Sequence, residues 1–165
     1  IYGATRTLVR APLQLSGLVI RPSIPELTRA YTEKNFTIIN KLNKLNLKAT
    51  LYSLLPISVI FLIFGKKIIF FISNGKIIAP YWLIVFLLLS IIFYGIWSCF
   101  STILVSINKQ KYFSYHYLFF VVASIALIYI FDFKNLEEIA FFMIFPEFIM
   151  IFLVYFKLKK INLVG

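Results

Sequence analysis

The sequence is poor in cysteine, histidine and acidic residues. Among its 165 residues are 1 Cys, 1 His and 6 Asp or Glu. Because Cys99 stands alone within an apolar run, the chain has no internal disulfide framework and no zinc site built on cysteines. His116 has no second histidine or cysteine placed to help it, so we expect no metal. Gly-rich phosphate loops, Walker-type lysine motifs and nucleophile elbows are also missing, which argues against a bound nucleotide or other cofactor.

What the chain has in excess is apolar surface. Hydrophobic residues make up 61% of the sequence, aromatic residues 19%, and the mean hydropathy is +0.92. A soluble domain of this size cannot hide so much apolar surface in its core. The sequence therefore predicts an integral membrane protein. The formal net charge of +11 comes from Lys and Arg residues that flank apolar runs, a placement that favours contact with lipid headgroups over binding of nucleic acid.

Four apolar runs are long enough to cross a bilayer, which takes about 20 residues of helix. They are residues 49–65, 81–107, 113–131 and 139–156. Backbone groups in lipid must satisfy their own hydrogen bonds, and the runs lack the alternation of barrel strands. We therefore predict an all-α, polytopic transmembrane bundle. Between the first two runs, we expect an interfacial segment that turns at Ser73, Asn74 and Gly75.

The distribution of charge predicts the orientation of the chain. Segments 21–48, 108–111 and 157–165 carry eleven Lys and Arg residues, whereas segments 66–80 and 132–138 carry only four. The positive-inside rule places the first set in the cytoplasm. We therefore expect a multi-pass protein of the cell membrane with a cytoplasmic C-terminus, and a segment 1–22 that enters from the outer side.

Residues 23–48 are predicted to form a cytoplasmic amphipathic connector. Ser23 fits a helix N-cap, with Pro25 in the first turn and Glu26 three positions after the cap. Apolar residues then recur at helical spacing, which is typical of a helix lying on the membrane surface before it turns into the span at residue 49. The segment is either a solvated linker or a strap that joins two halves of a moving bundle.

Segment 1–22 carries a polar stripe. Arg6, Arg10, Gln14, Gly17 and Arg21 are spaced to fall within about 80° of arc on one helix. On the opposite side of this helix we expect Leu8, Pro12, Leu15 and Val19. An Arg deep in a membrane helix costs roughly 2.5–3.5 kcal/mol on insertion scales, so the stripe indicates a watery cavity or an acidic partner. The alternative for Arg6 is that its side chain extends to the outer interface.

Glu147 is the one acid near the middle of a predicted span. An ionised carboxylate there is expensive, so it is protonated, paired or facing water. Cation coupling, an ion pair with Arg10, and a protonated side chain hydrogen-bonded to a neighbouring helix all remain open. Pro146, which precedes it, leaves a carbonyl one turn earlier without its donor, so we expect a bend at this level.

The second run carries a stripe of small and hydroxyl-bearing residues, which favours a close helix–helix seam over a ligand site. Its members are Ser90, Tyr94, Ser98 and Ser101.

The order of these features resembles a known family. An arginine-bearing helix leads to "IPELT" at 24–28, then to a basic amphipathic stretch, four spans, the turn "SINKQK" at 106–111 and an acid in the last span. This layout is similar to the C-terminal lobe of polysaccharide (O-antigen-type) flippases in the multidrug/oligosaccharidyl-lipid/polysaccharide exporter superfamily. Two details depart from the family pattern: Asn108 stands where Gly is usual, and residues 135–138 read "NLEE" where the family is Gly-rich.

The resemblance implies a specific function. Such proteins are MATE-like, with two six-helix lobes around a central cavity that opens alternately to each side, and they move undecaprenyl-diphosphate-linked oligosaccharides across the cell membrane. The expected partners are membrane lipid, the lipid-linked oligosaccharide and an N-terminal lobe of the same protein, since the chain begins at Ile1 without an initiator Met. Arg6 and Arg10 are expected to bind phosphate, Gln14 to bind sugar hydroxyls, and Glu147 to couple a cation.

Three other functions stay open. A drug/cation antiporter of the same superfamily is disfavoured by the basic stripe. A membrane-embedded polysaccharide polymerase or acyltransferase needs a catalytic constellation on a sizeable outer loop, whereas the outer loops here are short and carry no histidine, so we expect no enzyme. The third alternative is a membrane scaffold that transports nothing.

Overall fold

The computed structural model describes residues 2–163, except for the side chains of Leu15 and Val19. The described residues form helices and connecting turns, without a strand. The helices are α1 (Tyr2–Ile20), α2 (Ser23–Thr32), α3 (Phe36–Ile72), α4 (Tyr81–Ser106), α5 (Gln110–Ile130), α6 (Leu136–Phe142) and α7 (Ile144–Lys160). Four stretches are long and apolar enough to cross a membrane, namely α3, α4, α5 and α6 with α7. The all-helical, membrane-type bundle is thereby confirmed.

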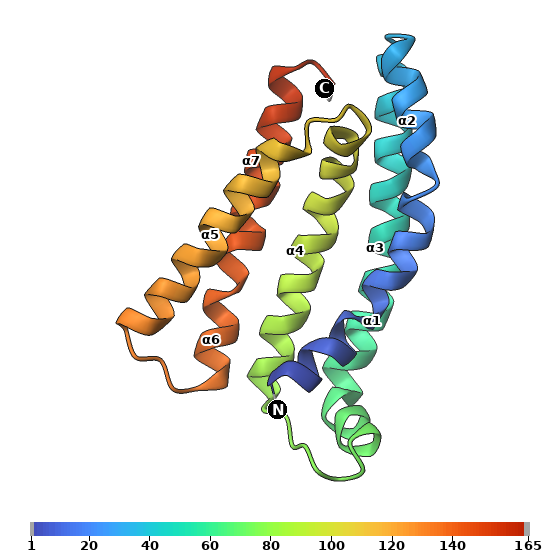
Figure 1. Ribbon diagram of the computed structural model, residues 1–165. Coiled ribbons are helices and arrows are strands. Elements are labelled where there is room, and N and C mark those ends of the chain that lie inside the picture. Colours follow the sequence, from blue (N-terminus) through green and yellow to red (C-terminus); the bar gives the residue numbers. More distant parts are fainter. Residues whose placement is uncertain (1, 164–165) are drawn as a thin grey trace.

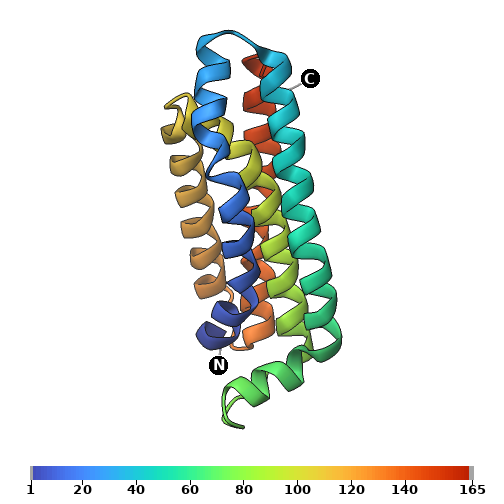
Figure 2. The same cartoon turned by 90° about the vertical axis from the view of Figure 1, so that its right-hand side faces the viewer.

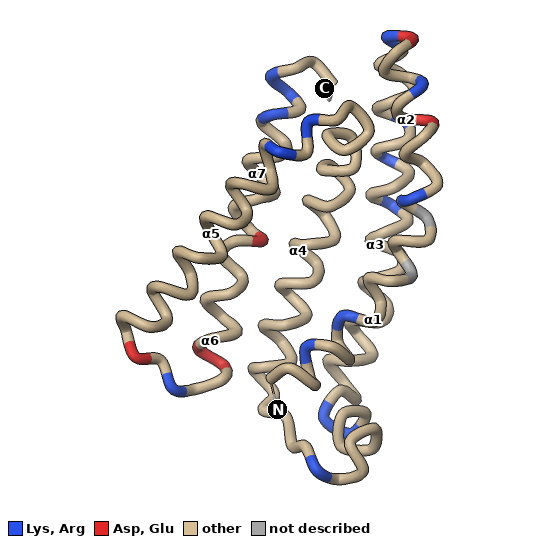
Figure 3. The backbone as a smooth tube through the Cα atoms, in the orientation of Figure 1, with Lys and Arg blue, Asp and Glu red and all other residues tan. Residues whose placement is uncertain are grey.

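The helices stand side by side (Figures 1 and 2). The chain runs one way through α1 and α2, back along α3, forward along α4, back along α5 and forward again through α6 and α7 (Figure 1). The loop between α4 and α5, the end of α7 and the α2–α3 hairpin share one end of the bundle, which we call the basic end because most Lys and Arg residues gather there (Figure 3). The turns before α4 and α6 share the opposite end. α4 lies at the centre and contacts every other helix.

The core is divided along α4 into two apolar clusters. The cluster at the end opposite the basic end includes Leu83, Ile84, Leu87, Leu88 and Ile91 of α4. The cluster at the basic end joins α4 to α2, α3 and α7 and includes Leu27, Ile39, Leu104, Met150 and Leu158. Two separate clusters leave the middle of α4 for polar and aromatic side chains, and the candidate functional site is built there.

Side chains of α3 pack directly on the α4 backbone at Gly95. A Cβ atom at this position would lie 2.5 Å from Leu54 Cδ1 and 3.1 Å from Thr50 Cγ2. One turn further along α4, the buried Cys99 Sγ lies 3.1 Å from Thr50 Oγ1. The absence of a side chain at Gly95 thus leaves room for Leu54 and Thr50 of α3.

The outer surface of the bundle is apolar. α5 exposes large side chains, among them Phe119 and Tyr129, which are 66% and 86% accessible. Such a continuous apolar surface is expected where a helix faces lipid.

The connector differs from its prediction. α3 runs without a break from Phe36 to Ile72, so residues 49–65 are the middle of a longer helix and the chain does not turn at 49. α2 and the start of α3 pack as a hairpin along the bundle direction (Figure 2) and do not lie flat on a membrane surface. The reason is that their apolar face packs within the protein: Leu27 and Ile39 are buried with α4, and Asn46 Nδ2 donates to Ser23 Oγ at 2.8 Å.

Ser23 was predicted to be the N-cap of α2. In the structure it is the first residue of the helix. Its hydroxyl donates to the Ile20 carbonyl at 2.6 Å, while Pro22 occupies the cap position without a side-chain hydrogen bond. The Ser23 hydroxyl thus donates to the Ile20 carbonyl and accepts from Asn46, whereas the prediction had it accept from the backbone of α2. The side chain therefore joins α1, α2 and α3.

Two helical stretches of the chain are interrupted or bent. The predicted bend in the last span is present: α6 ends at Phe142 and α7 begins at Ile144, as expected because Pro146 cannot donate to the Phe142 carbonyl. The last turns of α3 change direction and run across below the rest of the bundle (Figure 2). They end in the predicted turn, where Asn74 and Gly75 have φ of 52° and 77°.

Asn108 gives the chain a left-handed conformation at the end of α4. Its φ is 57°, which is the left-handed region, and it lies just after the end of α4. Glycine is the common residue at such a helix end, and asparagine is the side-chain-bearing residue that tolerates it best. The Asn therefore provides the backbone conformation that a Gly provides elsewhere.

The close approach at Gly95 gives the first prediction. Gly95→Val should lower the free energy of unfolding by about 1–3 kcal/mol, because the branched side chain overlaps Leu54 and Thr50. Gly3→Ala, at a position with nothing within 4 Å, is the control and should not destabilise the chain. Unfolding in detergent can be followed by a thiol-reactive fluorophore, since the single cysteine is buried. Equal melting curves for both variants would contradict the packing at Gly95.

The turn at Asn108 gives the second prediction. Asn108→Gly should be neutral or slightly stabilising, whereas Asn108→Val should cost about 1–2 kcal/mol, because a β-branched residue disfavours a positive φ. The same thiol-labelling melt measures both variants. A Val variant as stable as the Gly variant would exclude the left-handed conformation.

Candidate functional site

A polar cavity lies between α1 and α4, toward the basic end. Its volume is about 780 Å³, within the range of small-molecule sites. Residues from α1, α2 and α4 line it: Arg10, Leu13, Gln14, Ser16, Gly17, Leu18, Ile20, Arg21, Ile24, Tyr94, Ser98 and Thr102. Two guanidinium groups, an amide and four hydroxyl-bearing side chains of α1 and α4 therefore surround one space.

α1 can offer its polar stripe to this cavity because a neighbouring face carries the packing. Thr5, Val9, Pro12, Ser16 and Ile20 are the buried residues of α1, and their helical spacing puts them on one seam against α3 and α4. Of the residues predicted on the side opposite the polar stripe, Pro12 lies on this seam, whereas Leu8 is only partly buried. The predicted positions Leu15 and Val19 lie outside the described side chains.

Arg10 is partly buried and has an aromatic partner. Its Cζ lies 5.4 Å from the centroid of the Tyr94 ring, a cation–π contact that stabilises a guanidinium group by roughly 0.5–2 kcal/mol, depending on its desolvation. Among the described residues no carboxylate pairs with Arg10. Its N–H groups can therefore still donate to an anion in the cavity.

The other predicted residues of the stripe are spread along α1. Gln14 is exposed and lines the cavity, as does Arg21 at the basic end of the helix. Arg6 is partly buried one turn before Arg10 and is not among the described lining residues. The structure thus brings Arg10, Gln14 and Arg21 around one space and leaves Arg6 at the other end of the stripe.

Glu147 is held by two aromatic donors on neighbouring helices. It is only 4% accessible. Trp97 Nε1 of α4 donates to its Oε2 at 2.7 Å, and the Tyr117 hydroxyl of α5 donates to its Oε1 at 2.9 Å. Within residues 2–163 it forms no ion pair with Arg10 or any other cation. The predicted alternative of an ion pair with Arg10 is thus absent, and the two hydrogen bonds tie α7 to α4 and α5.

Aromatic rings connect the acid to the arginine. The Tyr94 ring, which contacts Arg10, packs edge-on against Trp97 with centroids 5.2 Å apart. Trp97 in turn donates to Glu147. We call the set Arg10, Tyr94, Trp97, Glu147 and Tyr117 the aromatic bridge.

The sequence missed three lining residues on α4. Tyr94 and Ser98 were assigned to a helix seam, yet they line the cavity together with Thr102. The sequence of one helix does not distinguish a hydroxyl stripe that packs against a partner helix from one that faces a water-filled cavity. The helical spacing of Tyr94 and Ser98 with Thr102 was the available signal.

Comparison of the chain with protein-family models, with curated proteins and with solved structures found no match. The site is therefore interpreted from its own chemistry.

The aromatic bridge leads to a third prediction. Glu147→Ala should lower the free energy of unfolding by about 1–3 kcal/mol, because it leaves the buried Trp97 N–H without an acceptor. Glu147→Gln keeps an acceptor oxygen and should cost less. Thiol-labelling melts of these variants, with Tyr117→Phe to complete a double-mutant cycle, measure the coupling. Additive effects of Glu147→Gln and Tyr117→Phe would show that the two side chains do not interact.

Proposed function

We propose that this chain is the C-terminal part of an exporter that moves lipid-linked oligosaccharides across the cell membrane by alternating access, for surface polysaccharide biosynthesis. The observation that carries the proposal is the basic, hydroxyl-lined cavity of about 780 Å³ between α1 and α4. The resemblance in the order of sequence features gives the proposal its substrate class, an undecaprenyl diphosphate that carries sugars.

The diphosphate accounts for the cations. A doubly charged group crossing a layer of low dielectric constant needs cationic partners, and a guanidinium fork binds phosphate oxygens in a bidentate way. Arg10, supported by the Tyr94 ring, is suited to hold one phosphate. Arg21 extends the positive charge toward the basic end, where the substrate enters from the cytoplasm.

The sugars account for the hydroxyl and amide groups. Gln14, Ser98 and Thr102 line the same cavity and offer both donors and acceptors to sugar hydroxyls. Ser98 Oγ and Thr102 Oγ1 also bond to carbonyls of the preceding turn of α4, at 2.9 Å each. Their remaining lone pairs can accept from a ligand.

Glu147 is proposed to couple the movement to a cation. It sits where α4, α5 and α7 meet, so a change in its charge alters the hydrogen bonds among three helices. Arg6, nearer the outer end of α1, is proposed to receive the diphosphate on its way out. The cationic lining disfavours the alternative of a drug/cation antiporter, because its substrate carries the same sign of charge.

A fourth prediction tests the role of Arg10 in the whole protein, expressed in cells that lack their own copy. Arg10→Gln should reduce surface polysaccharide, or transport of the lipid-linked sugar into proteoliposomes, by roughly tenfold or more, because it removes charge-assisted hydrogen bonds. Arg10→Lys should restore only part of the activity, since an ammonium group lacks the planar fork.

Arg29→Gln is the matched control. Arg29 is exposed and pairs with Glu33 at 2.8 Å, so its loss removes the same charge far from the cavity and should leave transport unchanged. Normal export by a folded Arg10→Gln protein would contradict the exporter and favour a scaffold. Single repeat units accumulating on the outer face would indicate a polymerase.

A further inference from the structure

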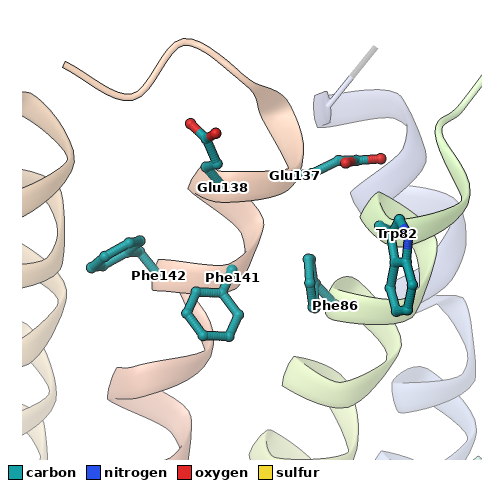
Figure 4. Close-up of a pocket in the computed structure, with 6 residues that line it drawn as sticks. All are labelled: Trp82, Phe86, Glu137, Glu138, Phe141 and Phe142. Carbon is teal, nitrogen blue, oxygen red and sulfur yellow. The ribbon is translucent and has the colours of Figure 1, made fainter. Parts of the chain in front are cut away.

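A second cavity lies at the opposite end of the bundle, where α4 and α6 begin. Its volume is about 410 Å³, and its walls are Trp82 and Phe86 of α4 with Glu137, Glu138, Phe141 and Phe142 of α6 (Figure 4). It shares no residue with the polar cavity between α1 and α4, which we call the basic cavity. Because both helices start here, the cavity lies at the level where apolar spans give way to polar turns.

Aromatic rings form the floor and one side of this cavity. Trp82 stacks on Phe86 with centroids 6.0 Å apart, and Phe86 meets the edge of Phe141 at 5.4 Å. Trp82 remains 56% accessible, so part of the indole is open to a ligand. The open part of the Trp82 ring is therefore the electron-rich surface available here, and indole rings attract ammonium groups.

Two carboxylates complete the lining. Glu137 points across the cavity toward Trp82 (Figure 4), and Glu138 Oε1 accepts from Asn135 Nδ2 at 2.8 Å. Among the described residues no cation pairs with either acid. Two ammonium groups at this end of the bundle have other partners: Lys134 pairs with Asp132 at 3.0 Å, and Lys66 lies 5.7 Å from the Tyr81 ring centroid.

We infer that this cavity binds an organic ammonium group, with the open surface of the Trp82 ring against the cation and Glu137 and Glu138 balancing its charge. Apolar walls select for the methyl or methylene groups next to the nitrogen, and the carboxylates select for positive charge. At a membrane interface, that chemistry belongs either to the headgroup of an aminophospholipid or to a free organic cation. The site is opposite in charge to the basic cavity and does not depend on its function.

The test compares two ligands of nearly the same shape. Choline and 3,3-dimethyl-1-butanol differ by a quaternary nitrogen in place of a carbon, and each is titrated calorimetrically into the purified full-length protein in a maltoside detergent at fixed ionic strength. Choline should bind saturably and the neutral alcohol at least about tenfold more weakly. Equal binding, or no binding of choline, would overturn the inference.

Three variants locate the site. Glu137→Gln, Glu138→Gln and Trp82→Leu should each weaken choline binding roughly fivefold, whereas Glu26→Gln removes an exposed acid near the basic end and should change nothing. Folding of each variant is checked by the thiol-labelling melt. If a variant does not fold, the other two and the two-ligand comparison still decide. Unchanged affinity in all folded variants of the cavity would refute the assignment.

The source of the ammonium group is then distinguished in nanodiscs. Native mass spectra show which lipids the protein retains. A lipid headgroup is identified if phosphatidylethanolamine is retained in preference to phosphatidylglycerol and if Glu137→Gln abolishes this retention. Choline binding without such retention would identify a free cation. Both results support an ammonium site, whereas preference for phosphatidylglycerol contradicts it.

Discussion

A guanidinium group cannot remain in the hydrocarbon layer unless water, an anion or an aromatic face compensates its charge, and the centre of this bundle is organised around that constraint. Arg10 meets the ring of Tyr94 on one side and the basic cavity on the other. α1 can hold it there because a separate face of the helix packs against α3 and α4. The close contact of α3 and α4 at Gly95 in turn keeps Tyr94 in place beside α1.

The single buried acid is compensated differently. Glu147 and Arg10 form no ion pair among the described residues and are connected through Tyr94 and Trp97. A direct pair in a low-dielectric interior is costly to separate. The aromatic bridge leaves Arg10 free for the proposed anionic substrate, while Glu147 holds α4, α5 and α7 together.

Hydropathy and local turn chemistry predicted most of the helices. The spans 81–107 and 113–131 correspond closely to α4 and α5, and the bend near Pro146 and the turn at Asn74 are present, because length, proline and turn chemistry act locally. The connector was wrong because an amphipathic helix looks the same whether its apolar face meets lipid or protein. For the same reason Tyr94 and Ser98 were taken for a seam: a site between helices depends on tertiary contacts that spacing along one helix does not encode.

The central claim is that the space between α1 and α4 is filled with water and open to small polar solutes. It is tested most directly by thiol accessibility, since maleimides react with the thiolate, which forms in water. In the full-length protein with Cys99→Ser, cysteines introduced at Gln14 and at Ser98 should react rapidly with a hydrophilic maleimide, whereas one at the exposed, apolar Phe152 of α7 should react slowly. Labelling at Gln14 and Ser98 as slow as at Phe152 would contradict a wet cavity, and with it the binding of a diphosphate there.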